Sequence, residues 1–448
     1  MASECVNEPS FRRYTEVFSS SCVEESLMSD QPPPRLRLAD RQHILAPMPL
    51  DQLLDCDHQA RIVWDFCLGL DLACLYDHIR SRHGGPGHPA IDPRLCVALW
   101  LYATLEGVGS ARALAWLCEN HNAFRWLMGG VSVDYHTLSD FRVAHVEVLD
   151  GLLTHSVAVL REQDLVDLNR VAQDGMRVRA SAGAASFRRR ATLQECLHEA
   201  QDQVARLKEE LDDDPAAPSR RHAAARERAA RQRTERLQQA LQRLPELEAK
   251  KKADDKAKAR VSTTDPEATV MKMADGGYRP AYNVQFSTDC GSQVIVGVAV
   301  IATGSDMGQL TPMTEQIHEH FQAYPEDMLA DGGFAAHKDI EAVQQRGCTV
   351  YAPVPQAKDP EQDRYAPHPG DSAAIREWRA RMATAEAKAI YKARAATAEC
   401  VNAQARNRGL VRLLVRGLRK VKAIALWFAL AHNVACGVRL RAAAGLVG

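Results

Sequence analysis

The sequence lacks the paired cysteines that mark zinc ribbons and disulfide frameworks. Its 12 cysteines are scattered singly, with no C-x-x-C pair and no regular spacing. We therefore expect them to be small buried hydrophobes in a reduced compartment. An excess of charge of one sign is lacking too, since 56 Lys and Arg stand against 57 Asp and Glu, for a formal net charge of −1. Any contact with nucleic acid must therefore come from local basic clusters.

A secretory signal is also lacking, because residues 1–35 contain no apolar core of the kind that signal peptides carry. This polar stretch ends in QPPP, whose prolines favour extended backbone, and it predicts a disordered leader. Met28 stands immediately before SDQPPP and is a candidate for the natural first residue of the protein. The most apolar stretch, 423–438, is about sixteen residues long and contains His432 and Asn433, so it predicts a core helix and no membrane span.

What the sequence does contain is enough chain for two or three domains of roughly 150 residues each. From 36 to about 165, apolar residues recur at helical spacing and predict an all-α amino-terminal domain. Such a block indicates either a helix-turn-helix that binds DNA ends or a plain helical bundle. Arg112, Arg125 and Arg142 are candidates for phosphate contacts. The four helical segments that we predict are 62–79, 92–108, 110–129 and 140–163.

A charged helical stretch follows, from about 187 to 260. It carries two narrow leucine stripes separated by DDDPAAPSR, which is typical of an antiparallel helical hairpin. From Arg220 to Arg260 it holds fourteen Lys and Arg against six Asp and Glu. Such a run is usually a solvated face. Here we also predict contacts with DNA phosphates, above all by three consecutive basic residues, Lys250, Lys251 and Lys252.

Strand patterns surround this insertion. Short apolar runs at 171–178, 280–289, 292–301, 327–334 and 348–354 alternate with helical segments. The order is strand, hairpin, helix, strand, helix, strand, helix, which fits a mixed α/β sheet flanked by helices. We expect this α/β domain over 166–440, with 441–448 as a tail.

Three carboxylates stand out in these patterns. Asp174 lies inside the apolar run 171–178, where a lone aspartate is costly to bury without a partner. Asp331 ends another apolar run and precedes two glycines, which leave room for a close approach of the backbone to DNA or metal. Glu399 lies in the Ala-rich helical stretch 391–409. If the three converge, their hard oxygen donors suit Mg²⁺ or Mn²⁺.

The order of these motifs resembles that of the bacterial insertion-sequence transposases of the DDE type. The resemblance rests on VAQDG, LADGGF and a helix with Tyr, Arg, Glu and Arg, together with DYHTLSDFR, GYRPAYNVQ and NRGLVRLLVRGLRKVKAIALWFALAHN. It covers nearly the whole chain from about residue 35. It implies an RNase H-like catalytic core, interrupted by a helical hairpin and preceded by an all-α domain. It also implies a bacterial, cytoplasmic, nucleoid-associated enzyme that binds double-stranded DNA at transposon ends and target, as a homodimer and without a membrane.

The resemblance further implies roles for the site residues. Asp174, Asp331 and Glu399 would be the catalytic triad and would hold two Mg²⁺ or Mn²⁺ ions, which activate the nucleophile and stabilise the leaving oxygen. Arg406 follows Glu399 by seven residues, about 10 Å along the same helical face, where its guanidinium would hold a phosphate near the scissile bond.

Other residues of this region have weaker assignments. Tyr391 would contact DNA or simply pack. Arg394 is a candidate DNA contact. It precedes Glu399 by five residues, which in an α-helix turns it about 140° away and argues against a catalytic role. Arg408 is a candidate DNA contact. Asp265 is an additional acidic candidate, although a turn-initiating Asp before Pro is the simpler account.

The sequence is consistent with two functions and, less well, with a third. The first is an active transposase that binds terminal inverted repeats and catalyses metal-dependent strand cleavage and transfer. The second is a catalytically inactive, transposase-derived DNA-binding or regulatory protein. A structure-specific nuclease is the third. The intact triad favours the first, and inverted repeats beside the gene would distinguish it from the others.

Overall fold

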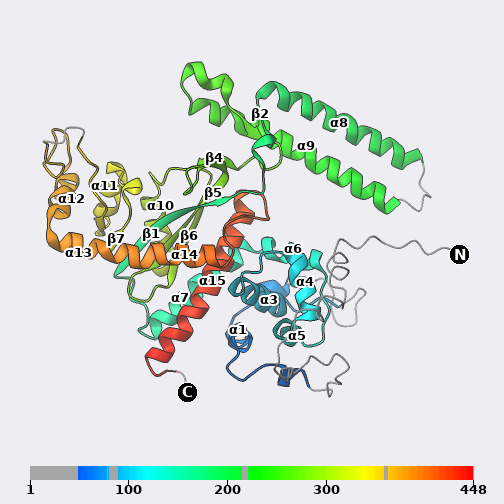
Figure 1. Ribbon diagram of the computed structural model, residues 1–448, viewed down its shortest axis with the longest axis horizontal. Helices are drawn as coiled ribbons and strands as arrows, with labels where there is room; N and C mark the ends of the chain where they lie inside the picture. The colour runs from blue at the N-terminus through cyan, green and yellow to red at the C-terminus, as the bar shows by residue number, and fades with distance from the viewer. Residues whose placement is uncertain (1–48, 78, 80–88, 214–219, 358–361, 447–448) are drawn as a thin grey trace, which may run out of the picture. The chain divides into compact units, whose positions relative to one another are not determined.

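The computed structural model describes residues 49–77, 79, 89–213, 220–357 and 362–446, and its elements are traced in Figure 1. One compact unit extends over Pro49–Gly448. Our predictions of a disordered leader and of a natural start at Met28 lie outside the described residues.

The amino-terminal part is helical, as predicted, but its helices are shorter than the apolar patterns indicated. The segment that we predicted over 140–163 is in fact two helices, bent by 67° at His145. The first of them begins early, because the Asp134 carboxylate accepts hydrogen bonds from His136 N and Thr137 N. The helices are α1 (Gln59–Leu68), α2 (Ala73–Asp77), α3 (Pro93–Leu105), α4 (Ala111–Asn120), α5 (Asn122–Met128), α6 (Tyr135–Ala144) and α7 (Val146–Glu162).

A six-stranded mixed sheet follows. The strands are β1 (Arg170–Arg179), β4 (Thr269–Lys272), β5 (Tyr278–Asp289), β6 (Ile295–Ile301), β7 (Asp327–Leu329) and β8 (Thr349–Tyr351). Their order is β4-β5-β1-β7-β8, and β6 also pairs with β5. Strand β5 is antiparallel to β1 and β6, whereas β1, β7 and β8 are parallel. The predicted mixed, RNase H-like arrangement is confirmed, and so is the pairing of β1 with β5.

A helical hairpin is inserted in the chain between β1 and β4, the next strand of this sheet. It consists of α8 (Arg190–Asp213) and α9 (Arg220–Ala249), and a two-stranded ribbon of β2 (Phe187–Arg188) and β3 (Val261–Ser262) closes its base. The leucine stripes pack on each other in a small core of their own, which contains Leu193, Leu237 and Leu244. The predicted insertion is therefore present in the fold.

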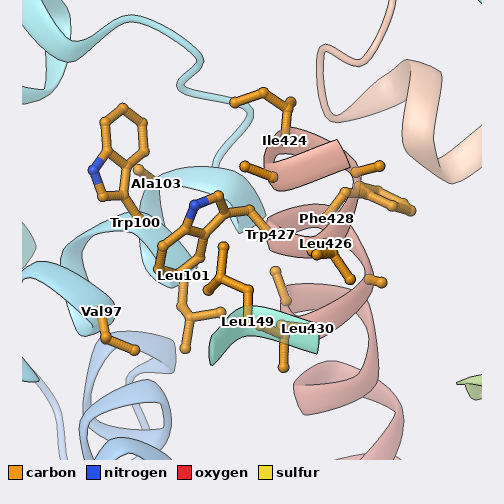
Figure 2. Packing of buried hydrophobic residues seen from close by; sticks show 14 of the residues in the cluster. Val97, Trp100, Leu101, Ala103, Leu149, Ile424, Leu426, Trp427, Phe428 and Leu430 are labelled. Carbon is orange, nitrogen blue, oxygen red and sulfur yellow. The ribbon is translucent and has the colours of Figure 1, made fainter. Parts of the chain in front are cut away.

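Helix α15 (Leu418–Ala443) packs against both the amino-terminal helices and the sheet. Figure 2 shows its Trp427 and Phe428 in the same core as Trp100 and Leu149. By length and composition this helix is able to cross a membrane, yet 83% of its most apolar window is buried inside the protein. That burial agrees with our prediction of a core helix.

Candidate active site

Asp174 lies in the middle of β1. Neighbouring β7 pairs with β1 only as far as Ala172, so in the described residues no strand pairs with β1 beside Asp174 on that side. The side chain is 15% exposed. Its Oδ1 accepts from Gly175 N at 2.9 Å, and its Oδ2 accepts from Asn402 Nδ2 at 2.9 Å. Burial raises the pKa of Asp174, and the nearby guanidinium of Arg394 partly opposes that rise.

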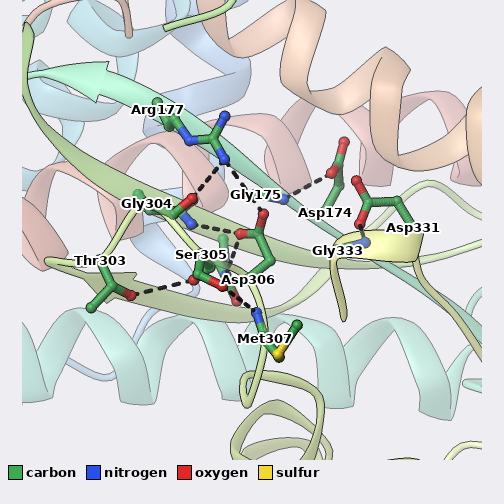
Figure 3. A network of polar contacts seen from close by, with 12 residues as sticks. Asp174, Gly175, Arg177, Thr303, Gly304, Ser305, Asp306, Met307, Asp331 and Gly333 are labelled. Atoms are coloured by element: carbon green, nitrogen blue, oxygen red, sulfur yellow. Dashed lines mark hydrogen bonds and ion pairs between the residues drawn. The ribbon is translucent and has the colours of Figure 1, made fainter. Parts of the chain in front are cut away.

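Asp331 follows β7 at the same end of the sheet. Its Oδ1 accepts from Gly333 N at 2.7 Å and so caps the short helical turn Gly332–Phe334. A Cβ on Gly333 would stand 2.9 Å from this same oxygen, so the glycine keeps the turn tight against the carboxylate. Figure 3 shows Asp174 and Asp331 pointing into one region from β1 and from the end of β7.

Glu399 comes from the helical segment that follows β8. This segment is α13 (Ala385–Arg394), a π-helical turn (Ala395–Glu399) and α14 (Cys400–Asn407). Our argument that Arg394 is turned away from Glu399 was wrong. It assumed an α-helix, whereas a π turn has i→i+5 hydrogen bonds and brings residues five apart onto one face. Arg394 Nη1 lies 3.1 Å from Glu399 Oε1.

Arg394 is the common neighbour of the three carboxylates. Its Nη2 lies 3.2 Å from Asp174 Oδ1 and 3.9 Å from Asp331 Oδ2. Burial acts to lower the pKa of Arg394, but the negative charges around it outweigh that effect and raise the pKa. The predicted triad is thus drawn together, and the cation at its centre is a residue to which we had assigned no catalytic role.

The donors suit a hard divalent cation in kind, because they are carboxylates beside an amide oxygen, Asn402 Oδ1, that is buried and has no hydrogen-bond partner among the described residues. In the described ranges, however, no group of three or more Asp, Glu, His or Cys is spaced closely enough to hold an ion. Here the carboxylates converge on the guanidinium of Arg394.

Sequence reasoning missed a fourth acidic residue, Asp306, in the loop between β6 and α10 (Leu310–Phe321). Figure 3 shows it beside Gly175 and Gly333, next to the two catalytic candidates. Its Oδ1 accepts from Asn283 Nδ2 at 2.6 Å and from Gln285 Nε2 at 3.0 Å. Gly175 was the sequence signal that could have pointed to it, because an isolated glycine inside a strand often marks a place where another part of the chain comes close to the strand.

The remaining basic residues that we predicted to contact DNA differ in how far their side chains are exposed. Arg406 is exposed at the end of α14, and Lys250, Lys251 and Lys252 are exposed beyond α9. Arg408 is half-buried, with its Nη1 buried and without a hydrogen-bond partner in the described structure.

Three further predictions can be compared with side-chain packing. Tyr391 is half-buried and packs against the core beneath the sheet. Arg142, a candidate for a phosphate contact, is half-buried, and its guanidinium lies 4.5 Å from the ring centroid of Trp100. Asp265 is fully buried and accepts from Tyr282 Oη at 2.7 Å, so its contacts are structural.

The sheet order and the carboxylates that follow its strands define the class: an RNase H-like core with acidic residues on β1, after β7 and on a later helix. Residues 49–144 match a family model described as Transposase domain (DUF772), and residues 255–434 match one described as Transposase DDE domain. Together these matches cover more than half of the chain. The chain belongs to the DDE-type transposases of insertion sequences. Comparisons with curated proteins and with solved structures each gave no match.

Membership in this family has general consequences. Transposases with a DDE domain are enzymes that cut and transfer DNA, so DNA is the partner that the family implies, and the family is generally dependent on divalent metal. Asp331, Glu399 and Arg406 fall inside the DDE match, whereas Asp174 lies before it.

Proposed function

We propose that the protein binds the terminal inverted repeats of its insertion sequence and catalyses metal-dependent strand cleavage and strand transfer. One observation carries this proposal: carboxylates from β1, from the end of β7 and from the helix after β8 lie within 3.9 Å of a single guanidinium. A site that gathers three acids far apart in sequence, at an open strand edge, is suited to phosphodiester chemistry.

Asp174, Asp331 and Glu399 are the residues that would hold two Mg²⁺ or Mn²⁺ ions. Bound there, the ions would supply activation of the nucleophile and stabilisation of the leaving oxygen. The chain itself fixes the donors: Asn402 and Gly175 N orient the carboxylate of Asp174, and Gly333 N orients that of Asp331.

The cationic side chains around the triad would position the DNA. Arg406, exposed on the last turn of α14, would hold a phosphate beside the scissile bond. Arg394 balances the negative charge of the carboxylates and, with Tyr391 beside it, lies where a DNA phosphate would compete for the same guanidinium.

Other parts of the chain would bind the rest of the DNA. The amino-terminal helices, 36–165 in our division, would contact the transposon ends, and Lys250, Lys251 and Lys252 would contact phosphates. The catalytic domain would extend over 166–440. We place the protein in the bacterial cytoplasm at nucleoid DNA, acting as a homodimer on paired ends.

The test uses the purified full chain, DNA carrying its genomic flanks, and Mg²⁺, with the cuts mapped to the nucleotide. Asp174→Asn, Asp331→Asn and Glu399→Gln should each lower cleavage by orders of magnitude while the affinity for the ends persists. Asp254→Asn, an exposed carboxylate far along the chain, is the control and should cut like the wild type.

Two results would contradict the proposal. Cleavage by Glu399→Gln at the wild-type rate would remove that residue from the site. Tight binding of the ends by a wild-type chain that cuts with neither Mg²⁺ nor Mn²⁺ would instead support the inactive, regulatory alternative.

A further inference from the structure

A cavity of about 320 Å³ lies along the second half of β1, directly after Asp174. Its walls come from β1, from the turn between β4 and β5, from the end of α14 and from the segment after it. On this edge, within the described residues, β1 has no strand partner between Ala172, where β7 stops, and a bridge that joins Arg179 to Arg412. Five arginines line the cavity: Arg177, Arg179, Arg279, Arg406 and Arg412.

Two of these arginines have partners within the protein. Arg177 Nη2 donates to Gly304 O at 2.6 Å and lies 3.9 Å from Asp306 Oδ2. Arg279 Nη1 lies 2.7 Å from Asp275 Oδ2. Asp275 is the cavity's acidic lining residue.

The other three arginines, Arg179, Arg406 and Arg412, are exposed. In the part of the chain that the structure describes, none of them forms an ion pair within 4 Å, although the charge of Arg179 helps to lower the pKa of Asp275. The positive charges of these guanidinium groups repel each other, and an anion bound between them relieves this repulsion. Phosphate suits them best, because a guanidinium binds its oxygens through paired hydrogen bonds.

The shape and the backbone of the cavity agree with a nucleic acid strand. Met176, Met273 and Val411 supply apolar wall between the arginines, suited to sugar carbons. Arg179 N donates to Val411 O at 3.2 Å. Alternate residues of a strand direct their backbone groups to the same side, so the backbone groups of Arg177 face this edge as well.

We propose that this cavity binds the phosphodiester backbone of the DNA strand that leads away from the scissile phosphate. The inference rests on the proposed function, because it takes the scissile phosphate to lie at Asp174. Along β1, Arg177 and Arg179 lie about 10 and 17 Å from Asp174 at ~3.3 Å per residue. A DNA strand advances about 3.4 Å per nucleotide, so Arg177 lies level with a phosphate roughly three nucleotides from the cut, and Arg179 and Arg412 lie level with one roughly five nucleotides from it.

The experiment is a double-mutant cycle between protein and DNA. End DNA is made with one neutral methylphosphonate at a time, over about six positions on either side of the mapped cut. Binding is measured by fluorescence anisotropy without divalent ions, so that no cleavage occurs. The proteins are the wild type, Arg412→Ala, Arg179→Ala, and the control Arg376→Ala, which removes an exposed arginine of α12 (Ala373–Ala383) outside the cavity.

We expect Arg412→Ala and Arg179→Ala each to weaken binding of unmodified ends about tenfold. Each should lower the slope of log affinity against log salt by about one. A methylphosphonate three to five nucleotides from the cut should weaken wild-type binding by a similar factor. When the arginine that contacts this phosphate is already replaced by Ala, the same methylphosphonate should weaken binding little further. Arg412→Lys should keep the salt slope and lose part of the affinity.

Additive losses at every position would overturn the inference, and so would a loss for Arg376→Ala equal to that for Arg412→Ala. In either case the arginines would act only through the overall positive potential of the protein surface and not through contacts with particular phosphates. A wild-type chain that cuts its ends while the cycle shows no coupling would overturn this inference and leave the proposed function standing. A wild-type chain that does not bind its ends would overturn both.

Discussion

At the scale of single residues, the close packing around Gly175 ties Asp306 to the catalytic strand. A Cβ at this position would stand 2.5 Å from Asp306 Oδ1 and 2.7 Å from Asn283 Oδ1. The Asp306 side chain is only 13% exposed, and two amides hold it. We therefore expect Asp306 to act as a positioning residue, because its hydrogen bonds to Asn283 and Gln285 hold it against β1 beside Asp174.

Gly175→Ala should destabilise the protein and slow cleavage together. The new methyl group must displace Asp306, and overpacking of this kind costs about 1–3 kcal/mol. Thermal unfolding and cleavage of end DNA would measure the two effects. Gly183→Ala is the matched control, because nothing lies within 4 Å of its Cβ, and it should stay within about 0.5 kcal/mol of wild type. Normal cleavage by Gly175→Ala would remove Asp306 from the positioning of the site.

The site was predictable from the sequence only where its residues stand in recognisable patterns. Asp174 and Asp331 each interrupt or end an apolar strand pattern, and Glu399 follows in a helix. Asp306 had no such setting, because it lies in a polar loop whose path depends on the packing of β6 and α10. The contact of Arg394 with all three carboxylates was likewise hidden, since spacing arguments assume a regular α-helix.

At the scale of elements, the π-helical turn shows why that assumption failed. Ala395–Glu399 departs from α-helical hydrogen bonding while Thr397 and Ala398 are buried, and Thr397 Oγ1 donates to Ala393 O at 2.9 Å. Helix breaks were missed for a related reason. Apolar periodicity continues across Gly69 and His145, whereas local caps and tertiary packing end the helices there. Strands were easier to predict, because five of the six strands of the sheet had distinct apolar runs, whereas β4 (Thr269–Lys272) was not predicted.

The helical hairpin is an element whose stability should be separable from that of the sheet. Its apolar side chains form their own core, and its base is closed by the β2–β3 ribbon. Replacing 190–258 by a Gly/Ser linker of about four residues should leave a folded protein whose melting temperature lies within a few degrees of wild type. Circular dichroism and thermal unfolding would check this.

A point variant in the core that α15 shares with the amino-terminal helices provides a comparison for the hairpin deletion. Leu149→Ala, which truncates a side chain packed with Trp427, should cost about 2–5 kcal/mol. If the hairpin deletion unfolds the chain more than this variant does, the hairpin is part of the main folding unit.

At the scale of the whole molecule, α15 joins the parts that we had divided into domains. Its Ile424 and Trp427 belong to the core shared with the amino-terminal helices, and its Cys436 belongs to the core beneath the sheet. Our boundary near 165 stays a prediction about function, since Pro49–Gly448 is one compact unit. A sequence pattern finds helices and strands, but it does not show that one long helix is shared by two cores.

His432, near the centre of α15, makes the stability of this unit depend on pH. Its Nε2 lies 2.9 Å from Gln293 O, so the neutral ring donates a proton there, because a carbonyl only accepts. The side chain is buried, and burial lowers its pKa to about 4, against 6.5 for the free group. The folded protein therefore binds fewer protons than the unfolded chain between these values. Its stability is fully present above pH 6.5 and is lost as the pH falls toward 4.

This linkage predicts a loss of about 2 kcal/mol in the free energy of unfolding between pH 7 and pH 5, growing to about 3 kcal/mol near pH 4. His432→Gln cannot take up the proton, so its unfolding free energy should change less than that of wild type over the same interval. Urea titrations at pH 7, 6 and 5 would measure the difference. The interval suits the test, because unperturbed carboxyl groups titrate below it. Parallel curves for wild type and His432→Gln would show that protonation of His432 does not govern the stability of the joined cores.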